Sequence, residues 1–346
     1  MKMKMERIFS NFYGCLSQKR TTTARRRCWD KEDIYPRQMD PFAVDGELKI
    51  ALAKAVRRLT DRTQVLTSPR NEHVRKRITH AGEVTALAVF MSDVMGLNTN
   101  LCRAIALGHD IGHPPFGHDG EAFLNQVGHG KVFRHEIFGV VIAQHIERCG
   151  HGLNLTLETL SGIARDAWPA GDRRNSTMSE ETKTVMWADR IAYLTGDFND
   201  MQRIGYPVGQ ELTRLMSSLG SNQRERVYTL ISALVAESGE AGAVSFDTSE
   251  EAQKFRKIRE LMYEHYPVIN ASNSLEILER IYGFVARTFK DLDPVPLIAL
   301  MTDQDALFLA GQPILDYPKL AETTVMELVP QLRKKPVLWY ELDLDW

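Results

Sequence analysis

The chain has 346 residues, of which 43% are hydrophobic and 25% charged, and this composition excludes a disordered, collagen-like or disulfide-scaffold protein. No apolar run approaches the ~18 residues of a membrane span, and no secretory signal is recognisable. The four cysteines form no C-x-x-C pair. We therefore expect a cytoplasmic protein without membrane contact. Residues 1–80 hold 19 Lys and Arg against 9 Asp and Glu, which predicts either a polyanion partner, such as single-stranded nucleic acid or nucleotide phosphates, or simply solvated charge.

The first half of the chain is predicted to be irregular over residues 1–40 and helical afterwards. Asp45 is predicted to cap a helix over 46–61. Gly96 is predicted to end a helix over 77–95. Asn98 can cap a short helix through 110, which must break at Pro114 and Pro115.

The second half is also predicted to be helical, with one exception at its end. The predicted helices cover 133–148, a long segment from Ser179 to about Arg203, 252–266 behind a Thr248–Glu251 capping box, and regions near 270–290 and 318–332. Residues 150–156 and 168–176 are predicted loops, and only 336–346 suggests a strand. The predicted fold class is therefore all-α.

Histidines are concentrated in one part of the sequence. Nine of the ten lie between residues 73 and 151, and the segment GHDIGHPPFGHDGE covers 108–121. His109 and His113 share a helical face, and Asp110 beside them is poor core material because a buried carboxylate needs a partner. A metal ion would be that partner, and His with carboxylate suits Mn, Fe, Ni or Zn better than Ca or Mg.

Two further segments offer ligands. His80 lies in RITHAGEV, and Asp189 begins a polar stripe on a helical wheel. The stripe members are Asp189, Arg190, Tyr193, Asp197 and Asp200. Such a stripe is either a solvent-facing surface or the wall of a polar cavity, and the apolar residues around it favour the cavity wall.

The ordered pattern of His80, His109-Asp110 and Asp189, together with HDIGHPPFGHDGE, resembles the HD superfamily of metal-dependent phosphohydrolases. More narrowly, it resembles the dGTPase-like deoxynucleotide triphosphohydrolases, through RRLTDRTQV (57–65), FRHE (133–136) and ADRIAYLTGDF (188–198). The resemblance covers about residues 40–205. It implies an HD-domain helical core over 41–205 and a mainly helical extension over 206–346 that completes the pocket and the subunit contacts. The basic, largely irregular segment expected over 1–40 would precede this core.

The resemblance implies a role for each matching residue. His80, His109, Asp110 and Asp189 would bind one divalent ion, with Mn²⁺ as the first candidate and Mg²⁺, Fe²⁺, Ni²⁺ or Zn²⁺ as alternatives. His118 and Glu121 would form an acid/base pair next to His113. The phosphates would be contacted by Arg77, His113, His135, Arg190 and Tyr193. Tyr193 would also lie against the ribose 2′ position, and Asp197 would bind the sugar 3′-OH. The base and sugar would be approached by Gln64, Arg58 and Leu59.

The implied activity is hydrolysis of dGTP or several dNTPs to a deoxynucleoside and inorganic triphosphate. The implied assembly is a symmetric homo-oligomer, such as a hexamer. One alternative is another HD phosphohydrolase, either a 5′-deoxynucleotidase or a cyclic-nucleotide phosphodiesterase. The other is a non-catalytic sensor of nucleotides or single-stranded nucleic acid, which the basic N-terminal quarter would suit.

Overall fold

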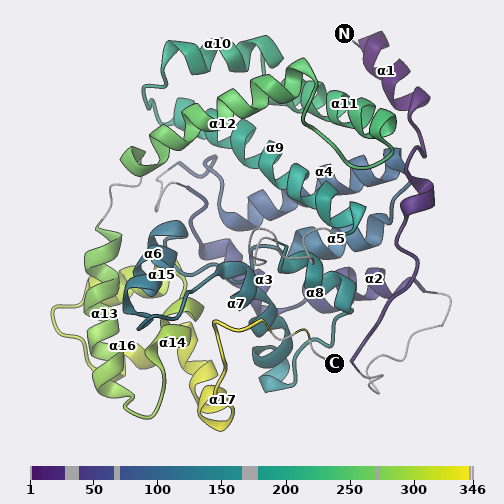
Figure 1. The fold of residues 1–346 in the computed structure, drawn as a ribbon. Coiled ribbons are helices and arrows are strands. Elements are labelled where there is room, and N and C mark those ends of the chain that lie inside the picture. The colour runs from purple at the N-terminus through teal and green to yellow at the C-terminus, as the bar shows by residue number, and fades with distance from the viewer. Residues whose placement is uncertain are drawn as a thin grey trace.

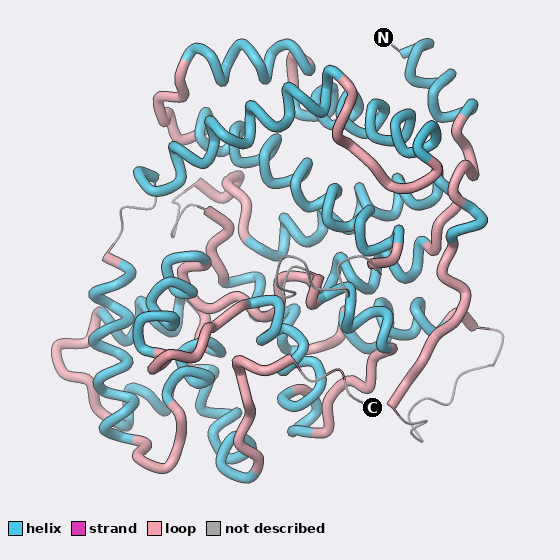
Figure 2. The backbone as a smooth tube through the Cα atoms, viewed as in Figure 1, coloured by secondary structure: helices cyan, strands magenta, loops and turns pink. Residues whose placement is uncertain are grey.

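The computed structural model describes residues 2–27, 39–65, 71–165, 178–269, 273–342 and 344. Within these ranges every regular element is a helix, and strand-like pairing is limited to two isolated bridges (Figures 1 and 2). The predicted all-α class is confirmed. In this part of the chain no helix is both long enough and apolar enough to cross a membrane.

Three helices form the centre of the molecule: α4 (Arg77–Met95), α5 (Thr99–Gly108) and α9 (Glu180–Arg203). Their ends follow the sequence predictions. The Asn98 side chain accepts from the backbone N–H groups of Asn100 and Leu101, and Ser179 accepts from that of Thr182. Gly96 ends α4 in the left-handed conformation, with φ of 78°.

Two hydrophobic cores lie on opposite sides of these central helices (Figure 1). One core is covered by α10 (Gln210–Leu219), α11 (Gln223–Ala241) and α12 (Glu250–Ile269). The other contains α3 (Lys54–Arg58), α6 (His118–Val127), α7 (His135–Val141), α8 (Leu157–Ile163), α13 (Ser274–Thr288), α14 (Pro294–Leu300), α15 (Asp303–Ala310), α16 (Tyr317–Ala321) and α17 (Val329–Lys334). The second half of the chain therefore packs against both sides of the centre.

The prediction of irregular chain over 1–40 is wrong at its beginning. Residues Lys2–Asn11 form α1, which packs on α11, and Leu16 is buried. Phe9 and Phe12 supply the reason, because both rings pack against the core beneath α11. Residues 28–38 lie outside the described ranges.

The predicted cap at Asp45 is also wrong. Asp40 caps the short helix α2 (Pro41–Ala43) by accepting from the backbone N–H of Phe42. Asp45 lies inside a π-helical segment, Val44–Ile50, and is completely buried, 2.7 Å from the Arg26 guanidinium. The single helix predicted over 46–61 is thus divided into this segment, α3 and a 3₁₀ turn, Leu59–Asp61.

Three further predictions differ from the structure. Within 133–148, α7 passes into a π-helical segment, Ile142–Ile146. At α12 the cap is Ser249 instead of Thr248, since the Ser249 hydroxyl accepts from the Ala252 N–H. The described part of 336–346 contains no strand; instead, Trp339 anchors this segment, since it is buried and its indole N–H donates to Asp293.

The helix predicted near 270–290 corresponds to α13. The helical region near 318–332 corresponds to α16, a 3₁₀ segment (Thr324–Leu328) and α17. The predicted loop over 168–176 lies outside the described residues.

Candidate metal centre

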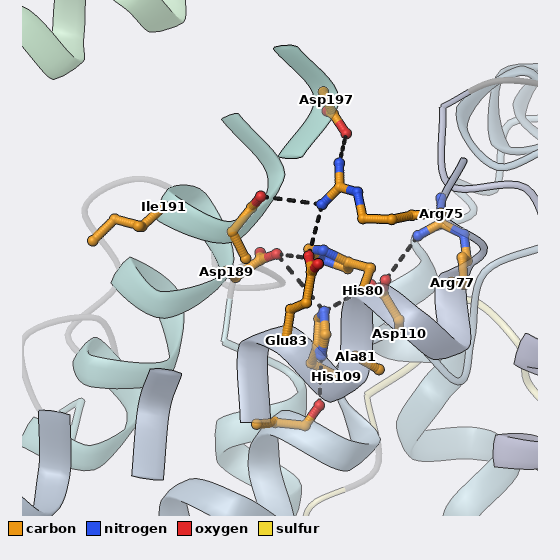
Figure 3. A network of polar contacts seen from close by, with 12 residues as sticks. Arg75, Arg77, His80, Ala81, Glu83, His109, Asp110, Asp189, Ile191 and Asp197 are labelled. Atoms are coloured by element: carbon orange, nitrogen blue, oxygen red, sulfur yellow. Dashed lines mark hydrogen bonds and ion pairs between the residues drawn. The ribbon is translucent and has the colours of Figure 1, made fainter. Parts of the chain in front are cut away.

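Four polar side chains from three helical segments meet between the two cores (Figure 3). His80 lies in the first turn of α4, and Asp189 lies on α9, which packs on α4. His109 is the C-cap residue directly after α5, and Asp110 follows it. Helix α5 must end ahead of Pro114, and this ending places the His109-Asp110 pair at the helix terminus beside α4 and α9.

The four side chains are linked by short contacts through the two imidazoles. His80 Nε2 lies 2.9 Å from Asp189 Oδ1, and His109 Nε2 lies 3.3 Å from Asp110 Oδ1 and 3.8 Å from Asp189 Oδ1. One ligand atom each from His80, His109 and Asp110 lie within 4.8 Å of one another, and all three residues are buried. Asp189 joins this group through its contacts with both imidazoles.

The tautomer of His109 suits a metal ligand. Its Nδ1 lies 2.7 Å from the carbonyl oxygen of Ala106, so Nδ1 carries the proton and donates it there. The opposite nitrogen, Nε2, faces the carboxylates and is buried without a hydrogen-bond partner, so it is the nitrogen that would bind a metal ion. An imidazole fixed in this way beside two carboxylates is a donor set that fits a divalent transition ion.

Each carboxylate turns its second oxygen towards a buried arginine. Arg77 Nη1 lies 2.8 Å from Asp110 Oδ2, and Arg165 Nη2 lies 2.6 Å from Asp189 Oδ2. Although burial opposes the effect, His109 and Arg77 hold the pKa of Asp110 well below its ordinary value. The His80 hydrogen bond and Arg165 likewise lower the pKa of Asp189 against the effect of burial. Sequence reasoning missed Arg165, because nothing in its local sequence distinguishes it.

A second group of side chains lies next to Asp110. The rings of His113 and His135 are stacked, with centroids 3.6 Å apart, and His113 Nε2 lies 3.4 Å from Asp110 Oδ1. Glu121 Oε2 lies 3.0 Å from His135 Nδ1 and 3.8 Å from His118 Nδ1. Glu121 Oε1 also accepts from the backbone N–H of His135. The predicted partners His118 and Glu121 are thus adjacent, but Glu121 is closer to His135.

Burial and neighbouring charges shift the pKa values of Glu121, His135 and His113 in this second group. Burial opposes ionisation of Glu121, but the neighbouring histidines, His135 foremost, hold its pKa far below the ordinary value. Burial also opposes charging of His135, but Glu136 and Glu121 outweigh it and raise the pKa of His135. Burial, Arg77 and His135 lower the pKa of His113, which is therefore neutral. His118 is different, because 74% of its side chain is exposed and accessible to a ligand.

The other residues predicted on α9 have protein partners. Arg190 lies 5.0 Å from the ring centroid of Trp187, and burial together with Tyr263 raises the pKa of Tyr193. Asp197 is buried and accepts from the Arg75 guanidinium and, at 2.9 Å, from the Tyr266 hydroxyl. Asp197 therefore helps to hold α9, α12 and the segment before α4 together, in addition to the sugar contact that the resemblance implies.

Sequence reasoning also missed Arg75. This buried side chain connects Asp197 with Glu83 and Asp200, which lie 2.9 and 2.8 Å from its nitrogens (Figure 3 shows its contacts with Asp197 and Glu83). The one sequence signal for a buried cation at this place is the polar stripe on α9, whose carboxylates need a partner.

The residues predicted near the base and sugar are separated from one another. Gln64 lines a small cavity of about 10 Å³ with Arg75 and Asp197. Leu59 is fully buried in a hydrophobic core. Arg58 lines a separate cleft, whose walls include none of the four metal-centre residues. The structure thus brings Gln64 towards α9 and directs Arg58 elsewhere.

Comparisons with known proteins agree with this geometry. Residues 77–194 match the family model of the HD domain. The chain is 39% identical over 198 residues to a deoxyguanosinetriphosphate triphosphohydrolase-like protein of Desulfatibacillum aliphaticivorans, covering 56% of each protein. It is 34% identical over 229 residues to the protein so named in Clostridium tetani, covering 64% of this chain and 65% of the relative.

A third relative with this name, from Caldanaerobacter subterraneus subsp. tengcongensis, is 38% identical over 184 residues, covering 53% of this chain and 52% of the relative. The chain thus spans between about half and two thirds of the length of the curated relatives it matches.

Proposed function

Because residues 77–194 match the HD-domain model and the chain is similar to deoxyguanosinetriphosphate triphosphohydrolase-like proteins, we propose that it is a metal-dependent phosphohydrolase that acts on deoxynucleoside triphosphates. The products would be a deoxynucleoside and inorganic triphosphate, with dGTP or several dNTPs as substrates. The observation that carries the proposal is the meeting of His80, His109, Asp110 and Asp189 directly beside His113.

The four converging residues would hold one divalent ion, with Mn²⁺ as the first candidate. When bound, such an ion supplies Lewis-acid polarisation of a phosphoryl oxygen and lowers the pKa of a bound water. Arg77 keeps Asp110 ionised and oriented, and its Nη2 is buried without a hydrogen-bond partner, so this nitrogen would donate a hydrogen bond to a phosphate oxygen.

Proton transfer would fall to His118 and Glu121. In the reaction the oxygen of a water joins the α-phosphorus, the bond from that phosphorus to the sugar O5′ breaks, and O5′ takes a proton. His118 Nδ1 faces Glu121, which leaves Nε2 of this exposed ring for the substrate. His113, His135, Arg190 and Tyr193 would neutralise and position the phosphates, while Asp197 and Gln64 would approach the sugar.

The proposal also extends to organisation and partners. Residues 41–205 would be the catalytic core, with 206–346 completing the pocket and the contacts of a symmetric oligomer, which sedimentation analysis would detect. The basic segment 1–40 would attract single-stranded nucleic acid, and this binding should weaken steeply with salt. Arg25 and Arg26 pair with Glu158 and Asp45, so these two side chains would contribute less to that attraction.

Product analysis tests the proposal. The protein is incubated with each dNTP, and separately with a deoxynucleoside monophosphate and a cyclic nucleotide, in Mn²⁺ or Mg²⁺, and the products are resolved by chromatography and phosphorus NMR. A deoxynucleoside with tripolyphosphate is the expected result. Release of a nucleoside from a monophosphate, or opening of a cyclic nucleotide, with intact dNTPs would replace the proposal by one of the other HD activities. Tight dNTP binding without turnover would identify a sensor.

A further inference from the structure

A cleft of about 370 Å³ lies outside the metal centre. It is formed by α3, the start of α15 and the 3₁₀ segment Thr324–Leu328. This volume is within the range of about 300–1,000 Å³ that is usual for small-molecule sites. Its wall combines apolar Leu300 and Leu328 with polar and charged side chains, so the cleft is suited to a small polar ligand.

Arg58 is the unusual member of the wall. Only 10% of its side chain is exposed, and its Nε and Nη2 atoms are buried without a hydrogen-bond partner. The Glu147 carboxylate is 3.8 Å away, too far for a hydrogen bond, and it already accepts from the backbone N–H groups of Lys54 and Ala55. A buried guanidinium with unmet N–H groups is costly, so these atoms need an acceptor.

The acidic side chains of the cleft do not provide that acceptor. Glu327 lies 2.5 Å from the ammonium group of Lys54. Asp305 accepts from the backbone N–H groups of Thr302 and Thr324 and from the Thr324 hydroxyl. Each of these acids is therefore engaged by a donor of its own, whereas two nitrogens of Arg58 have no hydrogen-bond partner.

The remaining acid of the wall is engaged in the same way. Asp61 accepts from the backbone N–H of Gln304 at 3.1 Å. Arg57 is exposed on the same helix as Arg58, and one of its nitrogens donates to the carbonyl oxygen of Leu52. Further positive charge thus lies next to Arg58.

We propose that this cleft binds the phosphate group of a small organic phosphate, with the Arg58 guanidinium as the central donor. The planar guanidinium matches two phosphate oxygens, which a lone ammonium group cannot do. A phosphate ion alone would leave much of the volume unfilled, so the rest of a ligand of mononucleotide size would lie against Leu300 and Leu328. The site is distinct from the metal centre and does not depend on the proposed activity.

Calorimetric titration of the full chain tests this proposal. Inorganic phosphate and dAMP serve as separate probes in buffer with a chelator, so that binding through a metal ion is suppressed. Four variants are compared with the natural protein: Arg58→Gln, Arg58→Lys, Arg190→Gln at the metal centre, and Arg214→Gln on the exposed surface of α10. Thermal unfolding of each variant identifies any loss of fold.

Arg58→Gln is expected to weaken binding at least about tenfold, because a hydrogen bond to a charged group contributes about 1.5–3 kcal/mol and 1.4 kcal/mol corresponds to a factor of ten. Arg58→Lys keeps the charge and should weaken binding less, while Arg190→Gln and Arg214→Gln should change it less than twofold.

If dAMP binds more tightly than phosphate, the ligand is a nucleotide; equal affinities identify a free phosphate.

Two results would overturn the proposal. One is the absence of binding by the natural protein up to about 1 mM of either probe. The other is loss of binding in Arg190→Gln with unchanged binding in Arg58→Gln, which would place the phosphate at the metal centre. If Arg58→Gln fails to fold, Arg58→Lys decides alone, and an affinity equal to that of the natural protein would count against the proposed guanidinium contact.

Discussion

At the scale of single residues, each carboxylate of the metal centre contacts both a histidine and an arginine. Asp110 and Asp189 each face a histidine with one oxygen and an arginine with the other. The arginines keep the carboxylates ionised and fix their rotation, while the histidine side stays available to a cation. This arrangement explains how two acidic groups can lie close together in a mainly apolar interior.

Arg165 is a positioning residue whose replacement is informative. Arg165→Met should weaken metal affinity by roughly 10- to 100-fold, the usual effect of removing a partner of a ligand, because Asp189 loses the group that orients it. Titration with Mn²⁺ measures the affinity. Arg165→Lys retains the charge and should lose less. An unchanged affinity in Arg165→Met would show that Arg165 does not orient the ligand.

Glu121 is expected to affect chemistry without affecting metal binding. It contacts His118 and His135 but none of the four proposed ligands. Glu121→Gln should therefore keep its metal content and lower the rate of dNTP hydrolysis by about 10²–10⁴-fold, the range for loss of general acid/base assistance. Simultaneous loss of metal would show that Glu121 supports the metal ligands instead.

At the scale of elements, the segment after α5 and the start of α7 approach each other very closely. A Cβ at Gly112 would lie 2.0 Å from the carbonyl oxygen of His135 and 2.3 Å from the backbone nitrogen of Gly139. Both atoms belong to the backbone and cannot turn aside. This contact brings His113 next to His135 and is needed for the stacking of their rings.

Gly112→Ala should therefore destabilise the fold by more than about 3 kcal/mol, since backbone must move to make room. Gly82→Ala is a matched control, because Gly82 is exposed on α4 and an added Cβ would meet nothing within 4 Å. The control should be stabilised by about 0.5–1 kcal/mol. Urea unfolding measures both changes. Equal stability of the two variants would contradict the close contact.

The N-terminus of α12 depends on a carboxylate from another helix. Glu237 on α11 accepts from the backbone N–H groups of Asp247, Thr248 and Ser249. Burial opposes the effect, but these bonds lower the pKa of Glu237 from 4.5 to about 2. A carboxyl group with a lowered pKa stabilises the fold above its unfolded pKa and loses that contribution as the pH falls towards its folded pKa.

The contribution of Glu237 should thus be complete above about pH 5 and should decline towards about pH 2. Glu237→Gln should be less stable than the natural protein at neutral pH, and the difference should shrink in acid. Urea midpoints measured across this pH range test the claim. A difference that stays constant with pH would mean that the charge of Glu237 does not matter.

Elements were predictable where their signals are local. Asn98, Ser179 and Gly96 act on residues next to them in the chain, and their helix ends were predicted correctly. Asp45 has the composition of a cap, but Arg26 and Thr156 from distant parts of the chain engage it in the interior. Thr248 loses its predicted role because Glu237 from α11 takes its N–H.

At the scale of the whole molecule, the C-terminal half supports the centre from a distance. Asp303 at the start of α15 accepts from the backbone N–H groups of Phe116 and Thr63, both at 2.9 Å. Phe116 lies in the HPPFGH segment with φ of 61°, two residues before His118. The loop that carries His118 is therefore held by a residue almost two hundred positions later in the chain.

This long-range support limits what the sequence could predict about the site. The motif around His109, together with His80 and Asp189, identified the residues that the structure brings together, because each segment has a recognisable pattern. Arg165, Arg75 and Asp303 have no such pattern, since each acts through a contact between distant segments. The orientation of Arg58 was missed for the same reason, because it depends on how α3 packs against α15.

Metal analysis of the reconstituted protein tests the central claim most directly. The natural protein, His109→Ala and a control, His151→Ala, are loaded with Mn²⁺, freed of excess ion and analysed by mass spectrometry. His151 is exposed and lies outside the cluster. We predict about one ion per chain for the natural protein and the control, and almost none for His109→Ala, because the variant lacks the buried Nε2 that would bind the ion. A metal-free natural protein, or a His109→Ala variant that keeps its ion, would contradict the account.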